Sequence, residues 1–119
     1  MKILIADDKP RVRRVIRRML EAQPSWEVEE AEDGVQAVIR AQQCKPDLIL
    51  LDLAMPEMNG FEAARQISSV LPSVPIFLNT LYASPLVELE ARKNGVQRVI
   101  SKSKQYELIP AIEEAIVHN

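Results

Sequence analysis

Short apolar runs alternate along the chain with longer segments in which apolar residues recur every three or four positions. Most of the runs lack the polar alternation of a half-exposed strand, which is typical of parallel strands covered on both faces. The spacing in the longer segments is that of helices with one apolar face. The predicted strands are residues 3–6, 26–31, 48–51, 76–78 and 99–100. The second of them carries several glutamates and is expected at an edge of the sheet.

The longer segments predict helices that pack their apolar faces on this sheet. Ser84 and Pro85 are residue types preferred at an N-cap and at the first helical position, and Gly95 suits the end of that helix. The stripes of the other four predicted helices are Val12-Val15-Ile16-Met19-Leu20, Val35-Val38-Ile39-Gln42, Phe61-Ala64-Ile67-Leu71 and Leu108-Ile109-Ile112-Ile116. Five strand–helix pairs in alternation predict an α/β fold with a doubly wound parallel sheet.

Composition supports a folded domain rather than a disordered or membrane-spanning chain. The 119 residues suit one domain, 1–119, with 47% hydrophobic and 27% charged residues. The net charge of −2 gives no reason to expect nucleic-acid contact, and no apolar stretch is long enough to cross a membrane. Acids at positions 7 and 8 interrupt any signal-peptide core, so a cytoplasmic location is expected. The single cysteine, Cys44, excludes an internal disulfide, and His118 is expected to have no role.

Chemistry-bearing side chains follow the predicted strands at their carboxyl ends, where doubly wound sheets bind ligands. They are Asp7, Asp8, Asp52, Thr80 and Lys102. Converging carboxylates repel unless a cation lies among them, and oxygen ligands suit Mg²⁺. Such an ion, together with a lysine, could neutralise a phosphoryl group as it transfers to a carboxylate oxygen. Singly, each residue has a structural explanation as a helix cap, a turn residue or a surface lysine, but their coincidence at four strand ends favours a site.

These strand ends resemble the receiver domain of bacterial two-component response regulators, and the resemblance covers the whole chain. It rests on the acidic pair that ends residues 3–8, on segment 46–56 with Asp52, and on Thr80 and Lys102. The stretch from Asp52 to Gly60 reads Asp, two residues, Met-Pro, three residues, Gly, which is specific to this family when it follows a buried strand. The resemblance implies a flavodoxin-like (βα)5 sandwich of the CheY-like superfamily, with strand order 2-1-3-4-5.

The resemblance also implies a role for each acidic residue. Asp52 would be the phosphoacceptor, receiving a phosphoryl group from the phosphohistidine of a sensor histidine kinase or a phosphotransfer protein. Asp8, Asp52 and the backbone carbonyl of Ala54 would ligate Mg²⁺, and Asp7 would help directly or through water. The domain would be a signalling switch rather than an enzyme that acts on other molecules.

The resemblance implies that the remaining two site residues take part in switching. Lys102 would pair with the phosphoryl group, and Thr80 would move toward it on activation. The face formed by the fourth helix, fifth strand and fifth helix would then change its partners. Those partners include a second copy of the chain and a DNA-binding output domain that is absent from this chain.

Three positions depart from the family's pattern. Val99 stands three residues before the lysine, where an aromatic residue is common, and Tyr82 is one candidate to replace it. Ser103 stands where the family has proline after a cis peptide bond, so we expect a trans bond or a strained loop, and Ser103 is a candidate cap for the last helix. Leu81 replaces a small residue and either restricts access of the phosphodonor or points into the core.

These departures motivate a second hypothesis, a phosphorylation-independent pseudo-receiver that serves as a docking or dimerisation module. An aspartyl-phosphate hydrolase is disfavoured because Ala54 stands where such enzymes carry a second aspartate. A flavin site is disfavoured because segment 7–10 would repel the flavin phosphate. The five arginines between positions 11 and 18 are interpreted as a solvated helix face or a surface for an acidic partner.

Overall fold

The computed structural model describes residues 1–117 and contains one sheet of five parallel strands, in the order β2-β1-β3-β4-β5. The strands are β1 (Lys2–Ala6), β2 (Glu27–Ala31), β3 (Leu48–Leu51), β4 (Ile76–Thr80) and β5 (Arg98–Ser101). The helices are α1 (Pro10–Glu21), α2 (Gly34–Cys44), α3 (Gly60–Val70), α4 (Pro85–Lys93) and α5 (Leu108–Val117), and a 3-10 helix, η1 (Lys102–Glu107), precedes α5. This architecture confirms the predicted fold and strand order. His118 lies outside the described residues.

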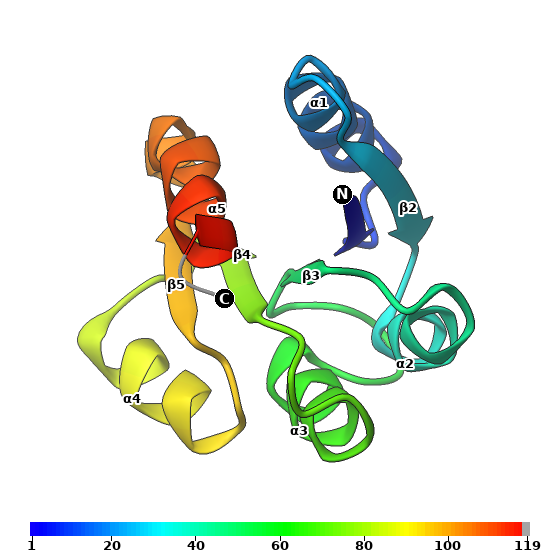
Figure 1. The fold of residues 1–119 in the computed structure, drawn as a ribbon. Helices are drawn as coiled ribbons and strands as arrows, with labels where there is room; N and C mark the ends of the chain where they lie inside the picture. The colour runs from blue at the N-terminus through cyan, green and yellow to red at the C-terminus, as the bar shows by residue number, and fades with distance from the viewer. Residues whose placement is uncertain (118–119) are drawn as a thin grey trace.

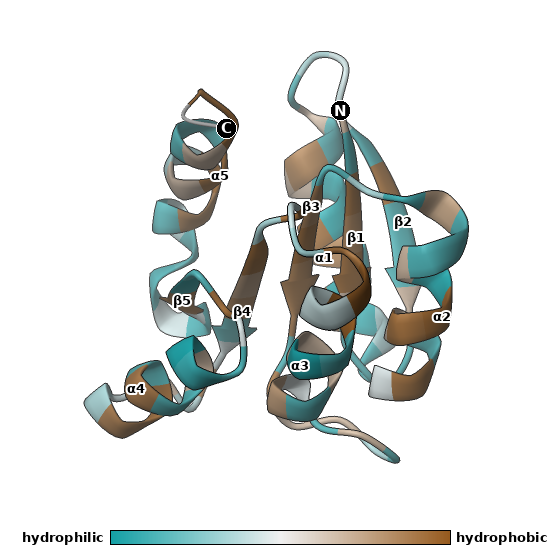
Figure 2. Cartoon of the chain, turned by 60° about the horizontal axis from the view of Figure 1, so that its bottom comes forward, coloured by the Kyte–Doolittle hydropathy of each residue, from teal (hydrophilic) through white to brown (hydrophobic). Residues whose placement is uncertain are grey.

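Helices cover both faces of the sheet, with α1 and α5 on one face and α2, α3 and α4 on the other (Figure 1). Successive strand side chains point to opposite faces, so each apolar run supplies both layers of the core. Leu50 and Phe77 face α1 and α5, while Leu51 and Leu78 face the other three helices. Figure 2 shows the hydrophobic central strands between helices in which hydrophilic and hydrophobic residues alternate. This two-sided burial explains why the runs carry no polar alternation.

Helix α2 packs mainly through small residues, and Val38 is the one position of the predicted stripe that packs against the core. Val35, Ile39 and Gln42 are exposed, whereas Ala37 and Ala41 are fully buried, so the prediction was wrong for the other three positions. At the start of the helix, a Cβ added to Gly34 would approach the backbone oxygen of Met58 to 2.0 Å. The first turn of α2 therefore lies directly against the loop that follows β3, and no larger side chain fits at position 34.

On α1, the sequence pattern also predicted that Val15 lies on the buried face, but this residue is 64% exposed. Ile16 and Leu20 are buried, and Val12 and Met19 pack against them in the core. The apolar stripe is therefore narrower than predicted, and Val15 lies on its flank.

The predicted boundaries of α4 are confirmed. The Ser84 hydroxyl accepts a hydrogen bond from the Val87 N–H at 3.1 Å, and Pro85 is the first residue of the helix. Gly95 follows the helix with φ of +86°, a conformation that glycine adopts without steric cost. Among residues 1–117, no helix has the length and apolar character that a membrane crossing requires.

Candidate functional site

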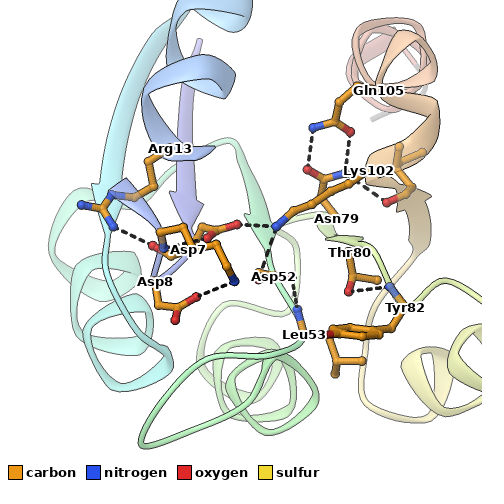
Figure 3. A network of polar contacts seen from close by, with 12 residues as sticks. Asp7, Asp8, Arg13, Asp52, Leu53, Asn79, Thr80, Tyr82, Lys102 and Gln105 are labelled. Carbon is orange, nitrogen blue, oxygen red and sulfur yellow. Dashed lines mark hydrogen bonds and ion pairs between the residues drawn. The ribbon is translucent and has the colours of Figure 1, made fainter. Parts of the chain in front are cut away.

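Three aspartates meet at the carboxyl edge of the sheet. Asp7 and Asp8 follow β1, and Asp52 follows β3, which pairs directly with β1. Each of the three carboxylates offers one oxygen atom, and these three oxygen atoms all lie within 4.8 Å of one another (Figure 3). The strand ends therefore bring these predicted residues together, as expected from the topology of a doubly wound sheet.

Asp7 is buried and held by three contacts. Its Oδ1 accepts a hydrogen bond from the Lys9 N–H at 2.9 Å, and its Oδ2 accepts one from the Lys102 ammonium at 2.6 Å. Its backbone oxygen accepts a hydrogen bond from the Arg13 guanidinium at 2.7 Å. Such charge-assisted contacts fix both the carboxylate and the turn that carries it.

Asp52 is also buried, with only 4% of its surface exposed. Its Oδ1 accepts a hydrogen bond from the Leu53 N–H at 2.8 Å, and its Oδ2 lies 3.3 Å from the Lys102 ammonium. Burial raises the pKa of the Asp52 carboxyl above its usual value; the Lys102 charge opposes this shift, and the Asp7 charge adds to it. Lys102 is thus shared between two carboxylates and lies closer to Asp7.

Asp8 provides the least satisfied oxygen of the cluster. Its Oδ1 is inaccessible to solvent and has no hydrogen-bond partner within residues 1–117, although the exposed Lys9 ammonium lies 3.7 Å away. Buried carboxylate oxygens without a donor are costly unless a cation binds them. Three carboxylates with one buried ammonium also leave an excess of negative charge. The donor set therefore fits a hard divalent cation with oxygen ligands.

The loop after β3 folds back over Asp52. The Gly60 N–H donates a hydrogen bond to the Leu53 oxygen at 2.8 Å, and a Cβ at position 60 would lie 2.3 Å from the backbone oxygen of Asp52. This close approach explains why glycine ends the motif that begins at Asp52. Ala54 is exposed in the same loop, two residues after the buried carboxylate.

Thr80 ends β4 beside these acids and is completely buried. Its hydroxyl accepts a hydrogen bond from the Tyr82 N–H at 3.2 Å. Leu81, between them, is 67% exposed, which contradicts the alternative that it points into the core. A side chain in the first residue after β4 has left the sheet, and the layers above and below no longer enclose it. Val99 is half-buried and packs against the core under α4.

The segment after β5 is a 3-10 helix, and its N-cap is not the residue that the sequence suggested as a cap for the last helix. The peptide bond before Ser103 is trans, since residues 1–117 contain no cis bond. Ser103 does not cap α5, because it lies inside η1 and Ser101 caps that 3-10 helix by accepting the Ser103 N–H at 3.1 Å. Figure 3 also shows a pair of side chains that the sequence did not reveal, Asn79 at the end of β4 and Gln105 in η1. The only sequence feature that indicated Asn79 was an amide side chain within a buried apolar strand, and no sequence feature indicated Gln105.

Comparisons with known proteins agree with this geometry. The family described as "Response regulator receiver domain" matches residues 3–113. A transcriptional regulatory protein of Bacillus subtilis, YxjL, is 37% identical over 117 residues, which make up 97% of this chain and 54% of that protein. Chemotaxis protein CheY of Listeria monocytogenes is 34% identical over 116 residues, covering 97% of this chain and 98% of its own length.

A two-component response regulator of the LuxR family from an Aurantimonas species has a similar solved structure. Its TM-score is 0.93 at 31% sequence identity, and the match covers 99% of this chain and 86% of that one. A protein-glutamate methylesterase of Myxococcus xanthus is 36% identical over 104 residues, but the matched part is 30% of its length. The chain thus spans only part of some relatives and nearly all of others. By the match over residues 3–113 and by its fold, the chain belongs to the response regulator receiver domain family of two-component systems.

Proposed function

We propose that the chain is a single receiver domain, 1–119, that accepts a phosphoryl group on Asp52. The observation that carries this proposal is the arrangement of charges around that carboxylate. Asp52 is buried, one of its oxygens is fixed by the Leu53 N–H, and the other lies 3.3 Å from the Lys102 ammonium. A nucleophilic carboxylate with a cation beside it can attack phosphorus while the charge of the phosphoryl oxygens is neutralised.

In the proposed transfer, a carboxylate oxygen of Asp52 forms a bond to phosphorus as the phosphorus–nitrogen bond of a phosphohistidine breaks. The electron pair of the broken bond stays on the imidazole nitrogen, which leaves with the donor protein. The Lys102 ammonium would move from Asp7 toward the negatively charged phosphoryl oxygens. This movement would be short, because the ammonium already contacts both aspartates. The Thr80 hydroxyl would offer its hydrogen to the same oxygens.

Asp7, Asp8, Asp52 and the backbone carbonyl of Ala54 would hold Mg²⁺. The support for this ion is the solvent-inaccessible Oδ1 of Asp8, which has no donor among the described residues, and the cluster of three carboxylates. When bound, the ion supplies positive charge that offsets the repulsion between the carboxylates and the incoming phosphoryl group.

The proposed partners follow from the family. A sensor histidine kinase or a phosphotransfer protein would donate the phosphoryl group in the cytoplasm. The α4–β5–α5 face would respond by changing its contacts, with a second copy or with an output domain that binds DNA. The domain would catalyse no reaction other than its own phosphorylation and dephosphorylation. A pseudo-receiver that docks without phosphorylation is the second candidate, favoured by the half-buried Val99 in place of an aromatic side chain.

The test is the mass of the intact protein after incubation with Mg²⁺ and acetyl phosphate. The wild type should gain one phosphoryl group, Asp52→Asn should gain none, and Asp47→Asn, which changes an exposed aspartate in the same manner, should behave as the wild type. An adduct that persists in Asp52→Asn would refute the assignment of the acceptor. A wild type that takes no phosphoryl group from acetyl phosphate or from a phosphorylated kinase would replace the switch by the pseudo-receiver.

A further inference from the structure

Two amide side chains connect the end of β4 to the segment that carries Lys102. Asn79 donates from Nδ2 to the Gln105 Oε1 at 2.8 Å, and Gln105 donates from Nε2 to the Asn79 Oδ1 at 2.9 Å. The second hydrogen of the Asn79 amide goes to the Ile100 carbonyl at 3.0 Å. This last contact fixes the orientation of the pair, because a flip of both amides would place the Asn79 oxygen against a carbonyl oxygen. We refer to Asn79 and Gln105 as the amide clamp.

The clamp brackets Lys102 along the chain. Ile100 lies two residues before the lysine and Gln105 three residues after it, and both are bonded to the same buried side chain of Asn79. Asn79 is only 2% exposed, so each of its polar atoms depends on these partners. The clamp therefore ties the backbone on both sides of Lys102 to the central sheet.

The backbone of η1 needs such an anchor. The 3-10 helix is short, and Lys104 inside it departs from helical dihedral angles, with φ of −130° and ψ of 48°, so helical hydrogen bonds do not run through it. Ser103 follows the lysine without the rigid ring of a proline. Among residues 1–117, apart from the contacts of Ser103 with the Ser101 hydroxyl, the side-chain hydrogen bonds that hold this segment to the rest of the domain are those of the amide clamp and of Lys102 itself.

We propose that Asn79 and Gln105 are positioning residues that hold the Lys102 ammonium between Asp7 and Asp52, in a domain that lacks the proline after its lysine. The clamp reaches the lysine through the backbone, and its hydrogen bonds within residues 1–117 go to neither aspartate. It lies on the α5 side of the sheet, opposite to the Thr80 side chain, because successive residues of β4 point to opposite faces. The consequence for phosphorylation rests on the proposed function of Asp52, whereas the placement of the ammonium does not.

The test compares Gln105→Met and Asn79→Leu with Gln66→Met, the same substitution at a half-buried glutamine on α3. Two quantities are measured for folded variants: the rate at which the Lys102 ammonium hydrogens exchange with water, by nitrogen-15 NMR, and the rate of phosphorylation by acetyl phosphate with Mg²⁺. The ammonium signal is assigned by its loss in Lys102→Met. A merely structural role of the clamp would lower stability without changing the exchange of this one ammonium group relative to the other lysines.

Both clamp variants should exchange the Lys102 hydrogens faster and accept the phosphoryl group roughly tenfold more slowly or worse, since small displacements of a charged group cost this much. The double variant should be no slower than the slower single variant, because both substitutions disrupt one unit. Exchange unchanged in Gln105→Met, or changed equally in Gln66→Met, would overturn the proposal. If the wild type takes no phosphoryl group but ammonium exchange still changes only in the clamp variants, the proposed function of Asp52 is refuted and the positioning role of the clamp is supported.

Discussion

Replacing Lys102 with methionine should destabilise the domain, and most at neutral pH. The ammonium contacts the Asp7 carboxylate at 2.6 Å and the Asp52 carboxylate at 3.3 Å, and both acids are almost fully buried. Methionine fills a similar volume without charge, so the substitution leaves two neighbouring carboxylates with no cation between them. Breaking a buried ion pair from one side leaves an uncompensated charge, which is strongly destabilising.

The distances in the cluster set the size of the loss. At about 5 Å and an effective dielectric constant of about 20, two carboxylates repel by roughly 3 kcal/mol. In the wild type the attraction of the ammonium to both carboxylates offsets this repulsion, and in the variant nothing does. The protein can escape this repulsion by protonating one of them, which costs roughly 4 kcal/mol at pH 7 for an acid of ordinary pKa near 4. The free energy of unfolding should therefore fall by about 3 kcal/mol at pH 7.

The sign of the pH dependence follows from the proton balance. In the variant the pKa of the Asp52 carboxyl should rise further, because burial and Asp7 still raise it while the opposing Lys102 charge is gone. Between the ordinary pKa and this raised value, the folded state binds more protons than the unfolded state, so stability increases as the pH falls. The difference between wild type and variant should shrink between pH 7 and pH 5.

Urea unfolding followed by the fluorescence of Trp26, which packs against the core, measures these changes. Lys93→Met, at an exposed position on α4, is the matched control and should change stability by less than about 0.5 kcal/mol. Saturating Mg²⁺ should restore part of the lost stability, because it places positive charge among the same carboxylates. Equal losses in both variants, or a loss at Lys102 that does not change between pH 7 and pH 5, would refute the reasoning.

Three further changes test other parts of the molecule. Asp8→Ala should weaken Mg²⁺ binding at least about tenfold by removing a ligand, measured by calorimetry, and unchanged affinity would refute the proposed site. Burial alone would raise the pKa of the Glu30 carboxyl, but hydrogen bonds from Arg17 and Arg13 hold this pKa below its usual value. The ion pairs of Glu30 with these arginines therefore stabilise the fold above pH 4.5, and this stabilisation is lost as the pH falls. Glu30→Gln should cost about 1 kcal/mol at pH 7 and almost nothing near pH 3 in urea unfolding; a constant difference would contradict this. Val99→Tyr should change the NMR shifts that phosphorylation produces on α4, β5 and α5 without slowing phosphorylation, and slower acceptance would show that chemistry and readout are not separate.

The sequence predicted the sheet well because its strands are buried on both faces and so read as uninterrupted apolar runs. It failed for α2 because hydrophobic patterning favours large side chains on the inner face. In α2 the buried positions are instead Gly34, Ala37 and Ala41, and Ile39 is exposed. Distance between helices is a tertiary property, and no local spacing of residues records it.

The acidic residues of the site were predictable for a similar topological reason. Strand order places Asp7, Asp8 and Asp52 together whatever the details of packing. The partners of Lys102 were not predictable, because its long side chain can reach either aspartate from the end of β5. The amide clamp escaped notice because Gln105 lies in a 3-10 helix with no periodic pattern, and its partner Asn79 is distant in sequence.

The charges that suit this site for phosphoryl transfer are also those that reduce its stability. Three carboxylates lie close together, and the Lys102 ammonium contacts two of them. Burial raises the pKa of the Asp52 carboxyl, so the folded domain holds this anion at a cost. Asp52→Asn should therefore stabilise the fold while weakening the proposed ion binding, because Lys102 keeps Asp7 as its partner. Within residues 1–117, the solvent-inaccessible Oδ1 of Asp8 has no hydrogen-bond donor, which also costs stability. This oxygen, together with the two neighbouring carboxylates, supports the proposed ion site independently of the departures at Val99 and Ser103.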